Sequence, residues 1–227
     1  AFLGSQPGQL AGALVPSDES LRMPATGHTI SGWVKSPDFS VANPSNSYFT
    51  LVASQGMPHS GAARHQAWSL QYGGHGISMQ ATGGDNAQGG YVHIKFSTTD
   101  PATTFLENDK WHHMVVTYDG SKFSGYINGS AMTVWGNPNV ANLTPKFTGR
   151  DTGIGMVANR RVDQWLPVNN GYIDEIRIYN RGLSAEEVTE LYELDKPKES
   201  QNDEWAQSTF QSVEGDFTWQ EAKADAE

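Results

Sequence analysis

Short apolar stretches, separated by Gly, Pro, Asn and Asp, run along the chain as far as residue 180. Many of them alternate between apolar and polar positions, which is the two-residue period of a β-strand. The predicted strands cover residues 21–23, 29–35, 48–54, 67–72, 76–81, 91–97, 111–119, 123–128, 132–135, 152–158 and 172–179. About eleven short strands without intervening helices predict an antiparallel sandwich or barrel.

The segment 183–194 departs from this pattern and has helical spacing. Val188 and Leu191 lie three residues apart on one face of a helix. Ser184 is a favourable N-cap, and Glu187 follows it three residues later, as in a capping box. The pattern predicts a short helix that closes the sandwich.

The chain after residue 194 changes in character. Residues 195–227 are polar, charged and poor in β-branched residues, which is typical of a linker. The sequence therefore predicts one domain over residues 1–194, followed by a polar linker and the truncated start of another module over 195–227.

Composition and charge narrow the possible functions. The chain has no cysteine, which excludes disulfides, thiolate metal sites and a cysteine nucleophile. The net charge of −10 is uneven, because residues 1–180 carry −1 and residues 181–227 carry −9. A nearly neutral body without a basic stripe argues against nucleic acid as a partner. The sequence contains no apolar run of about 18 residues, which argues against membrane insertion.

Three blocks carry a family resemblance. They are "SLRMPATGHTISGWVKS", "WHHMVVTYDGSKFSGYINGS" and "GYIDEIRIYNRGLSAEEVTELYE". Together, in this order and spacing, they resemble the LamG-like (laminin G-like) domains of the concanavalin A-like lectin/glucanase group, over roughly residues 10–194. The resemblance implies an all-β fold, an antiparallel two-sheet jelly-roll sandwich with one short C-terminal helix. The resemblance does not indicate which ligand is bound, because lectins, glycosidases, adhesion modules and spacers all share this fold.

Asp174 is the candidate metal ligand. Strict alternation places it on one face with Ile176 and Ile178, the face expected to look into the core. The resemblance implies a structural calcium ion, held in many relatives by the aspartate of the final strand and by backbone carbonyls. A hard cation would offset the cost of burying the carboxylate. Two alternatives stay open: backbone amides or an arginine hold the carboxylate, or water wets it at a sheet edge.

The candidate ligand-binding residues lie in Gly-rich and Asn-rich stretches. Trp165 stands between two predicted strands, close to Arg161 and Asp163, and Asp85 and Asn86 lie in "GGDNAQGGY". Sugar rings stack on exposed aromatic rings, and carboxylates, amides and guanidinium groups bind their hydroxyls. These residues are therefore candidates for glycan binding. The alternative for Trp165 is a loop residue that folds back to plug the edge of the sandwich.

Catalytic carboxylates are not evident. Retaining glycosidases use two carboxylates roughly 5 Å apart. Glycosidases that share this sandwich carry Glu-x-Asp-x-x-Glu on a strand, whereas "ENDKWH" places His112 where the second Glu should stand. The block, with Glu107 and Asp109, also falls on the turn before the hairpin of the second block. We therefore expect no enzymatic activity, with glycoside hydrolase and polysaccharide lyase as the less favoured alternatives.

The last residues carry a faint second resemblance. "FTWQEAKADAE" is similar to the first helix of C-type lectin-like domains, with Trp219 and Ala222 in place but Ala226 where that family has cysteine. The alternative is an amphipathic terminal helix. Together these observations predict a non-catalytic carbohydrate-binding module of a larger, multidomain, secreted or cell-surface bacterial protein. The alternative function is a structural or adhesive spacer that binds protein.

Overall fold

The computed structural model describes most of the first 197 residues of the chain. The described residues are 12–37, 39, 49–55, 66–72, 76–82, 91–97, 106–135, 139–141, 143, 149–158, 165–167 and 171–197. Contacts separate a unit Ala1–Lys196 from a unit Pro197–Glu227. Only the first unit is considered below, because residues 198–227 lie outside the described part of the chain.

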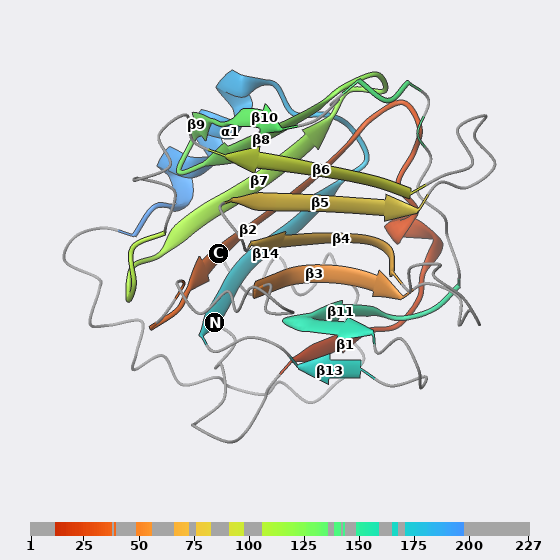
Figure 1. Cartoon of the computed structure of the whole chain (residues 1–227), viewed down its shortest axis with the longest axis horizontal. Coiled ribbons are helices and arrows are strands. Elements are labelled where there is room, and N and C mark those ends of the chain that lie inside the picture. Colours follow the sequence, from red (N-terminus) through yellow and green to blue (C-terminus); the bar gives the residue numbers. More distant parts are fainter. Residues whose placement is uncertain are drawn as a thin grey trace, which may run out of the picture. The chain divides into compact units, whose positions relative to one another are not determined.

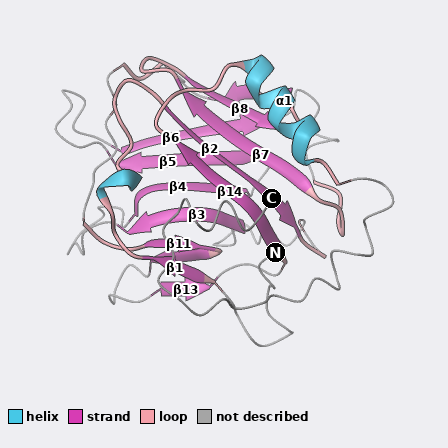
Figure 2. Cartoon of the chain, turned by 180° about the vertical axis from the view of Figure 1, so that it is seen from behind, coloured by secondary structure: helices cyan, strands magenta, loops and turns pink. Residues whose placement is uncertain are grey.

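Two antiparallel sheets form the body of the domain (Figures 1 and 2). The seven-stranded sheet has the order β1 (Ala13–Val15), β11 (Thr152–Ile154), β3 (Phe49–Gln55), β4 (Gln66–Tyr72), β5 (Ile77–Thr82), β6 (Tyr91–Ser97) and β10 (Thr133–Trp135). The five-stranded sheet has the order β14 (Tyr172–Tyr179), β2 (His28–Lys35), β7 (His112–Tyr118), β8 (Phe123–Ile127) and β9 (Ser130–Ala131). A separate pair consists of β12 (Met156–Ala158) and β13 (Trp165–Pro167), and the described helices are the 3-10 helix η1 (Glu19–Leu21) and α1 (Ala185–Asp195). The predicted all-β sandwich with one C-terminal α-helix is confirmed.

The core lies between the two sheets and is filled by alternate residues of each strand. The inward residues include Leu70 and Met79 from the larger sheet, and Met114 and Val116 from the smaller one, all buried. Each such side chain removes apolar surface from water, which is the main favourable term in folding. Gly125 of β8 lets the ring of Phe96 of β6 pack closely against it, because a Cβ there would lie 2.4 Å from Cγ of Phe96.

Two predicted strands differ from the observed elements. Residues 21–23 were expected to form a strand, but the structure has η1, whose N-cap Asp18 accepts a hydrogen bond from the Ser20 amide. The predicted strand 152–158 is split at Gly155, which has φ +68°. This left-handed residue ends β11 in the large sheet and starts β12, which pairs with β13 instead.

β14 contains a bulge that changes the direction of its side chains. Glu175 has φ +48°, and the register with β2 shifts between Asp174 and Arg177. Ile173 before the bulge is part of the core, and Ile176 after it packs against the same core. The prediction that Asp174 shares the inward face of Ile176 was therefore wrong. Asp174 follows the inward Ile173 and points away from the core, because one extra residue in the strand resets the alternation.

Helix α1 covers part of the outer face of the five-stranded sheet (Figure 2). Its start is the predicted capping box: the Ser184 hydroxyl accepts from the Glu187 amide, and the Glu187 carboxylate accepts from the Ser184 amide. A second apolar cluster joins the helix to the sheet, with Val115, Tyr126, Leu183 and Val188 buried and Tyr179 and Leu191 packed around them. The expected helix is confirmed, and it packs on the outside of the five-stranded sheet.

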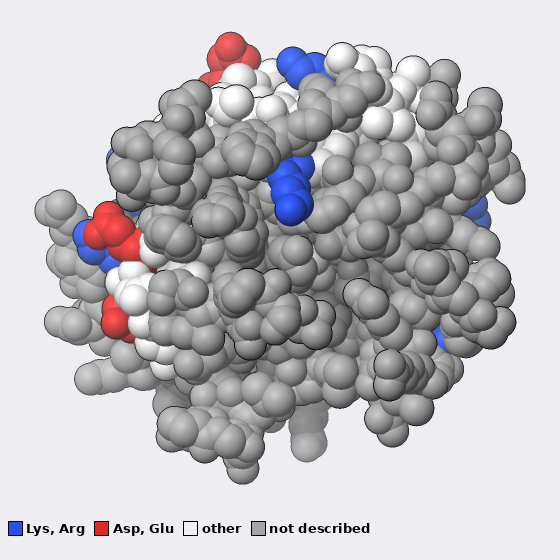
Figure 3. Space-filling model, in the orientation of Figure 1, with Lys and Arg blue, Asp and Glu red and all other residues white. Residues whose placement is uncertain are grey.

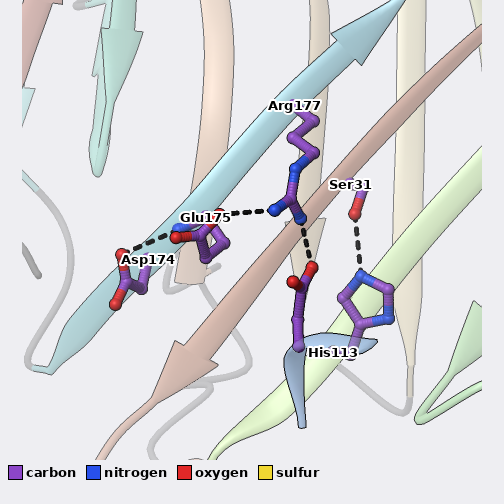
Figure 4. A network of polar contacts seen from close by, with 6 residues as sticks. Ser31, His113, Asp174, Glu175 and Arg177 are labelled. Atoms are coloured by element: carbon purple, nitrogen blue, oxygen red, sulfur yellow. Dashed lines mark hydrogen bonds and ion pairs between the residues drawn. The ribbon is translucent and has the colours of Figure 1, made fainter. Parts of the chain in front are cut away.

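An aromatic stack lies under the end of this helix. The His113 ring stacks on Trp33 at 5.0 Å between centroids, and Tyr192 of α1 stacks on Trp33 at 5.7 Å. His113 Nε2 lies 2.8 Å from Ser31 Oγ. Arg177 bridges Glu175 and the helix residue Asp195 beside the stack (Figure 4). Together these contacts tie the last turns of α1 to strands β2, β7 and β14.

His113 makes the stability of the fold depend on pH. The ring is fully buried, and its Nδ1 has no hydrogen-bond partner among the described residues. Burial lowers the pKa of His113 to about 4, although nearby Asp195 opposes this shift. Burial likewise lowers the pKa of His28 to about 4. Both rings are therefore neutral in the folded protein and take up protons near their ordinary pKa when it unfolds.

We expect the free energy of unfolding to fall as the pH decreases from about 6.5 towards about 4. The unfolded state binds protons in this window that the folded state does not, at roughly 1 kcal/mol per pH unit for each histidine. Urea denaturation of wild-type protein and His113→Asn between pH 7 and 5 measures this slope. The variant should lose part of it, because His28 and His112, whose pKa values burial also lowers, still contribute. An equal slope in both proteins would contradict the account.

Candidate functional site

The outer face of the seven-stranded sheet carries a row of polar side chains across four strands. On β4, Gln71 lies between the core residues Leu70 and Tyr72 and so faces away from the core. The strand register places Gln71 opposite Thr50 of β3 and Ser78 of β5, and Ser78 opposite Lys95 of β6. We call Thr50, Gln71, Ser78 and Lys95 the polar row. The strands that carry it lie at the front of the molecule in Figure 1.

The polar row changes from buried to exposed along its length. Thr50, Gln71 and Ser78 are buried, whereas Lys95 is exposed. Gln71 Nε2 donates a hydrogen bond to Thr50 Oγ1 over 3.3 Å, which fixes the orientation of the amide. A hydroxyl and an amide each offer donors and acceptors, and Lys95 adds a cationic donor at the open end.

A strip of small residues runs beside the polar row. Gly153 of β11 pairs with Ala53 of β3, and Ala53 pairs with Ser69 of β4. Ser69 Oγ is buried and has no hydrogen-bond partner among the described residues. An unpaired buried hydroxyl costs free energy, so a polar group that reached Ser69 would be favoured there.

The polar row offers hydrogen-bonding groups of three kinds. Its described polar groups are hydroxyls, an amide and an ammonium group, which bind neutral polar ligands or single anionic groups by hydrogen bonding. The neighbouring small residues Ala53 and Gly153 are buried as well.

The glutamates of the body lie elsewhere and are engaged in surface ion pairs. Glu19, Glu107 and Glu175 are the only glutamates before residue 180. They pair with Arg22 at 2.8 Å, Lys110 at 2.5 Å and Arg177 at 2.6 Å, respectively. Glu107 stands in the turn before β7, as the sequence predicted. None of the three lies on a strand of the seven-stranded sheet.

Of the five predicted ligand-binding residues, the described part of the chain includes only Trp165. Trp165 was expected in a long loop, but it starts the short strand β13, where it pairs with Ala158 of β12. The predicted strand breaks at Gly155, so β12 does not continue in the seven-stranded sheet and instead pairs with β13. The other candidates, Arg161, Asp163, Asp85 and Asn86, lie outside the described residues.

Asp174 is half-buried on the outer side of β14, and its Oδ1 accepts a hydrogen bond from the Glu175 amide over 2.8 Å. The described residues contain no group of three or more His, Asp or Glu side chains arranged to hold a metal ion. Because Asp174 faces away from the core, burial in the core gives no reason for a cation there. The calcium site stays a prediction that rests on the family resemblance and on backbone carbonyl ligands.

The polar row and Ser69 were not among the site residues predicted from the sequence. The signal was present in "WSLQY" and "ISMQ", where small polar residues alternate with large apolar ones. Such alternation is typical of a sheet with one polar outer face and one apolar face that packs on the core. It could not show which polar residues face one another, because that depends on pairing between distant strands.

Charge is scattered over the described surface. Figure 3 shows single basic and acidic residues, not a continuous patch of one sign, among the described residues on this face. Among the described residues, no helix is both long and apolar enough to cross a lipid bilayer.

Several solved structures share this fold at low sequence identity. A SAP-like pentraxin from Limulus polyphemus aligns with a TM-score of 0.53 and 12% identity, covering 84% of this chain and 79% of its own. The ligand-binding domain of botulinum neurotoxin serotype D, in complex with N-acetylneuraminic acid, aligns with a TM-score of 0.53 and 17% identity. That match covers 81% of this chain and 40% of the toxin domain.

The binding domain of botulinum neurotoxin DC, in complex with rat synaptotagmin II, aligns with a TM-score of 0.54 and 18% identity, covering 81% of this chain and 40% of its own. The chain thus spans about 40% of the length of the toxin binding domains that it matches. No curated protein sequence is detectably similar to this chain.

At the level of families the assignment is clear. A family model described as the concanavalin A-like lectin/glucanases superfamily matches residues 8–189, which is most of the chain. The two antiparallel sheets and the C-terminal helix agree with this match. The chain therefore belongs to the concanavalin A-like lectin/glucanases superfamily.

Proposed function

We propose that this domain is a non-catalytic carbohydrate-recognition module of a larger secreted or cell-surface protein. In this proposal, the outer face of the seven-stranded sheet holds the sugar. The polar row hydrogen-bonds its hydroxyls, and one hydroxyl reaches Ser69. The observation that carries the proposal is the buried Ser69 hydroxyl beside the polar row, which has no hydrogen-bond partner in the described part of the chain.

Hydrogen-bond complementarity supports a sugar over an apolar ligand. Gln71 already donates to Thr50, so the amide is held in place before a ligand arrives. An oriented group loses little side-chain entropy on binding. The buried hydroxyl of Ser69 would exchange an unsatisfied state for a hydrogen bond to a ligand hydroxyl.

The structural neighbours support the same ligand class. The botulinum neurotoxin D domain was solved with N-acetylneuraminic acid bound. Other neighbours are also binding domains, and one of them was solved with a protein, synaptotagmin II. Because these matches are below 20% identity, they support a binding role without naming the sugar for this chain.

The glutamates support a non-catalytic role. Glycoside hydrolysis requires two carboxylates that face each other across the sugar. Glu19, Glu107 and Glu175 are each paired with a basic side chain, and none lies on the sheet proposed to hold the sugar. The superfamily also includes glucanases, so hydrolysis is the activity to exclude by assay.

Ser69→Ala separates ligand binding from stability. The substitution removes an unpaired buried hydroxyl, so the free energy of unfolding of the ligand-free protein should rise by about 1 kcal/mol. Glycan affinity should fall by roughly threefold to tenfold, because one hydrogen bond to the ligand is lost. Urea denaturation measures the first effect, and affinity electrophoresis in gels with soluble polysaccharides measures the second.

Ser130→Ala on β9 is the matched control, because this serine is exposed on the other sheet. It should change neither quantity. The proposed function would be contradicted by wild-type protein that binds no polysaccharide in a glycan array or in gels. That result would favour the structural or adhesive spacer, which binds protein.

We further propose that Asp174 holds the predicted structural calcium. Calcium added to protein stripped with a chelator should raise the Tm of wild-type protein by a few degrees, since a ligand that binds only the folded state stabilises it. Asp174→Asn should abolish the increase. Asp151→Asn serves as the control, because Asp151 is a half-buried aspartate directly before β11, a strand of the other sheet. Equal calcium responses in wild-type protein and Asp174→Asn, measured by differential scanning calorimetry, would rule out this site.

A further inference from the structure

A second outward-facing row lies on the five-stranded sheet. Tyr172 of β14 pairs with Lys35 of β2. Val34 pairs with His112, the first residue of β7, so the antiparallel register places Trp111 beside Lys35. The rings of Trp111 and Tyr172 meet with centroids 6.4 Å apart and planes inclined by 54°. We call Trp111, Lys35 and Tyr172 the aromatic row.

The aromatic row points away from the core. Val34 and Ile173, the neighbours of Lys35 and Tyr172 in sequence, are both core residues. Successive strand residues point to opposite faces, so Lys35 and Tyr172 face outward. Trp111 and Lys35 are half-buried, and Tyr172 is 37% exposed.

Exposure of Tyr172 sets it apart from the other aromatic residues. Among the described residues, the large apolar side chains counted as exposed are Leu14, Tyr172 and Leu194. Tyr172 alone of these is aromatic and in ring contact with a second aromatic residue. The two inclined rings present an aromatic surface of the kind that stacks on the C–H face of a pyranose.

Backbone contacts hold this surface in position. The Asp109 amide donates to the carbonyl of Ser36 over 2.8 Å, which joins the turn before Trp111 to the end of β2. His112 Nε2 hydrogen-bonds the Glu107 carbonyl at 3.0 Å across the same turn. At Gly171 a Cβ would lie 2.1 Å from the Lys35 carbonyl oxygen, so the chain runs close to β2 just before Tyr172. A surface held in this way binds with a small loss of entropy.

The charges near the aromatic row favour a neutral ligand. Lys35 lies in the row, and Asp174 lies two residues beyond Tyr172 on the same side of β14. In calcium-free protein their opposite charges offset each other, and both groups can hydrogen-bond hydroxyls, so the binding test below is run with a chelator present. An acidic sugar gains no net attraction from such a pair.

We propose that the aromatic row is a second carbohydrate site, which binds a neutral pyranose by stacking on Trp111 and Tyr172. It belongs to the five-stranded sheet, whereas the polar row belongs to the seven-stranded sheet. The two sites face away from the shared core in opposite directions. One domain could therefore hold two chains of a polysaccharide, and bivalent binding raises the apparent affinity for a polymer.

The test is affinity electrophoresis of the whole chain in gels with neutral β-glucan, mannan, galactan or arabinan, and with polygalacturonate as the acidic probe. Tyr172→Ala should weaken binding to at least one neutral polysaccharide by roughly threefold to tenfold. Tyr172→Phe keeps the ring and should bind like wild-type protein. Leu194→Ala is the matched control, because Leu194 is a 79% exposed apolar residue on α1. Equal urea midpoints for all variants show that they are folded.

The outcomes separate this site from the polar row. Loss of neutral-glycan binding in Tyr172→Ala but not in Ser69→Ala supports the aromatic row and contradicts the proposed function at the polar row. Loss in Ser69→Ala alone, with Tyr172→Ala equal to wild type, overturns the aromatic row. Wild-type protein that no neutral polysaccharide retards also overturns it, even if polygalacturonate is bound.

Discussion

The packing of alternate strand residues between the two sheets determines what each outer face can carry. On β4, Leu70 and Tyr72 fill the core, so Gln71 must face outward. On β2, Val34 fills the core, so Lys35 must face outward. Removing the inward side chains from water supplies the free energy that holds this alternation. The polar row and the aromatic row are therefore both consequences of the same core.

The two outer faces have different chemistry because they are covered differently. On the five-stranded sheet, helix α1 brings Tyr192 over Trp33 and His113, and Arg177 pairs with Asp195 at the helix end. This part of the face is structural. The adjacent row of the same sheet contains Tyr172 and remains partly exposed. On the seven-stranded sheet, small polar residues occupy the outer positions instead, which suits hydrogen bonding more than stacking.

Local signals in the sequence were sufficient for much of the fold. The capping box of Ser184 and Glu187 predicted the start of α1, and alternation predicted most strands of both sheets, though not β1 or β9. The bulge at Glu175 could not be predicted, because a non-glycine residue with positive φ carries no compositional signal. As a result the predicted orientation of Asp174 was wrong, although the strand that carries this residue was predicted correctly.

The candidate sites depended on information that one sequence does not contain. Gln71 and Ser78 are seven residues apart in the sequence, yet Thr50 and Lys95 join the same row only through strand pairing. Pairing between distant strands is set by the global fold and not by local pattern. Attention to tryptophan in predicted loops therefore favoured Trp165 and passed over a row of common polar residues.

The most direct measurement of the central claim is an amide NMR titration of the labelled protein with a polysaccharide fragment that it binds. The account predicts that the largest shift changes fall on β3, β4 and β5, around Ser69 and Gln71, with a separate set around Tyr172 for a neutral fragment. Shift changes confined to helix α1, or absent from both sheets at saturating fragment, would contradict it.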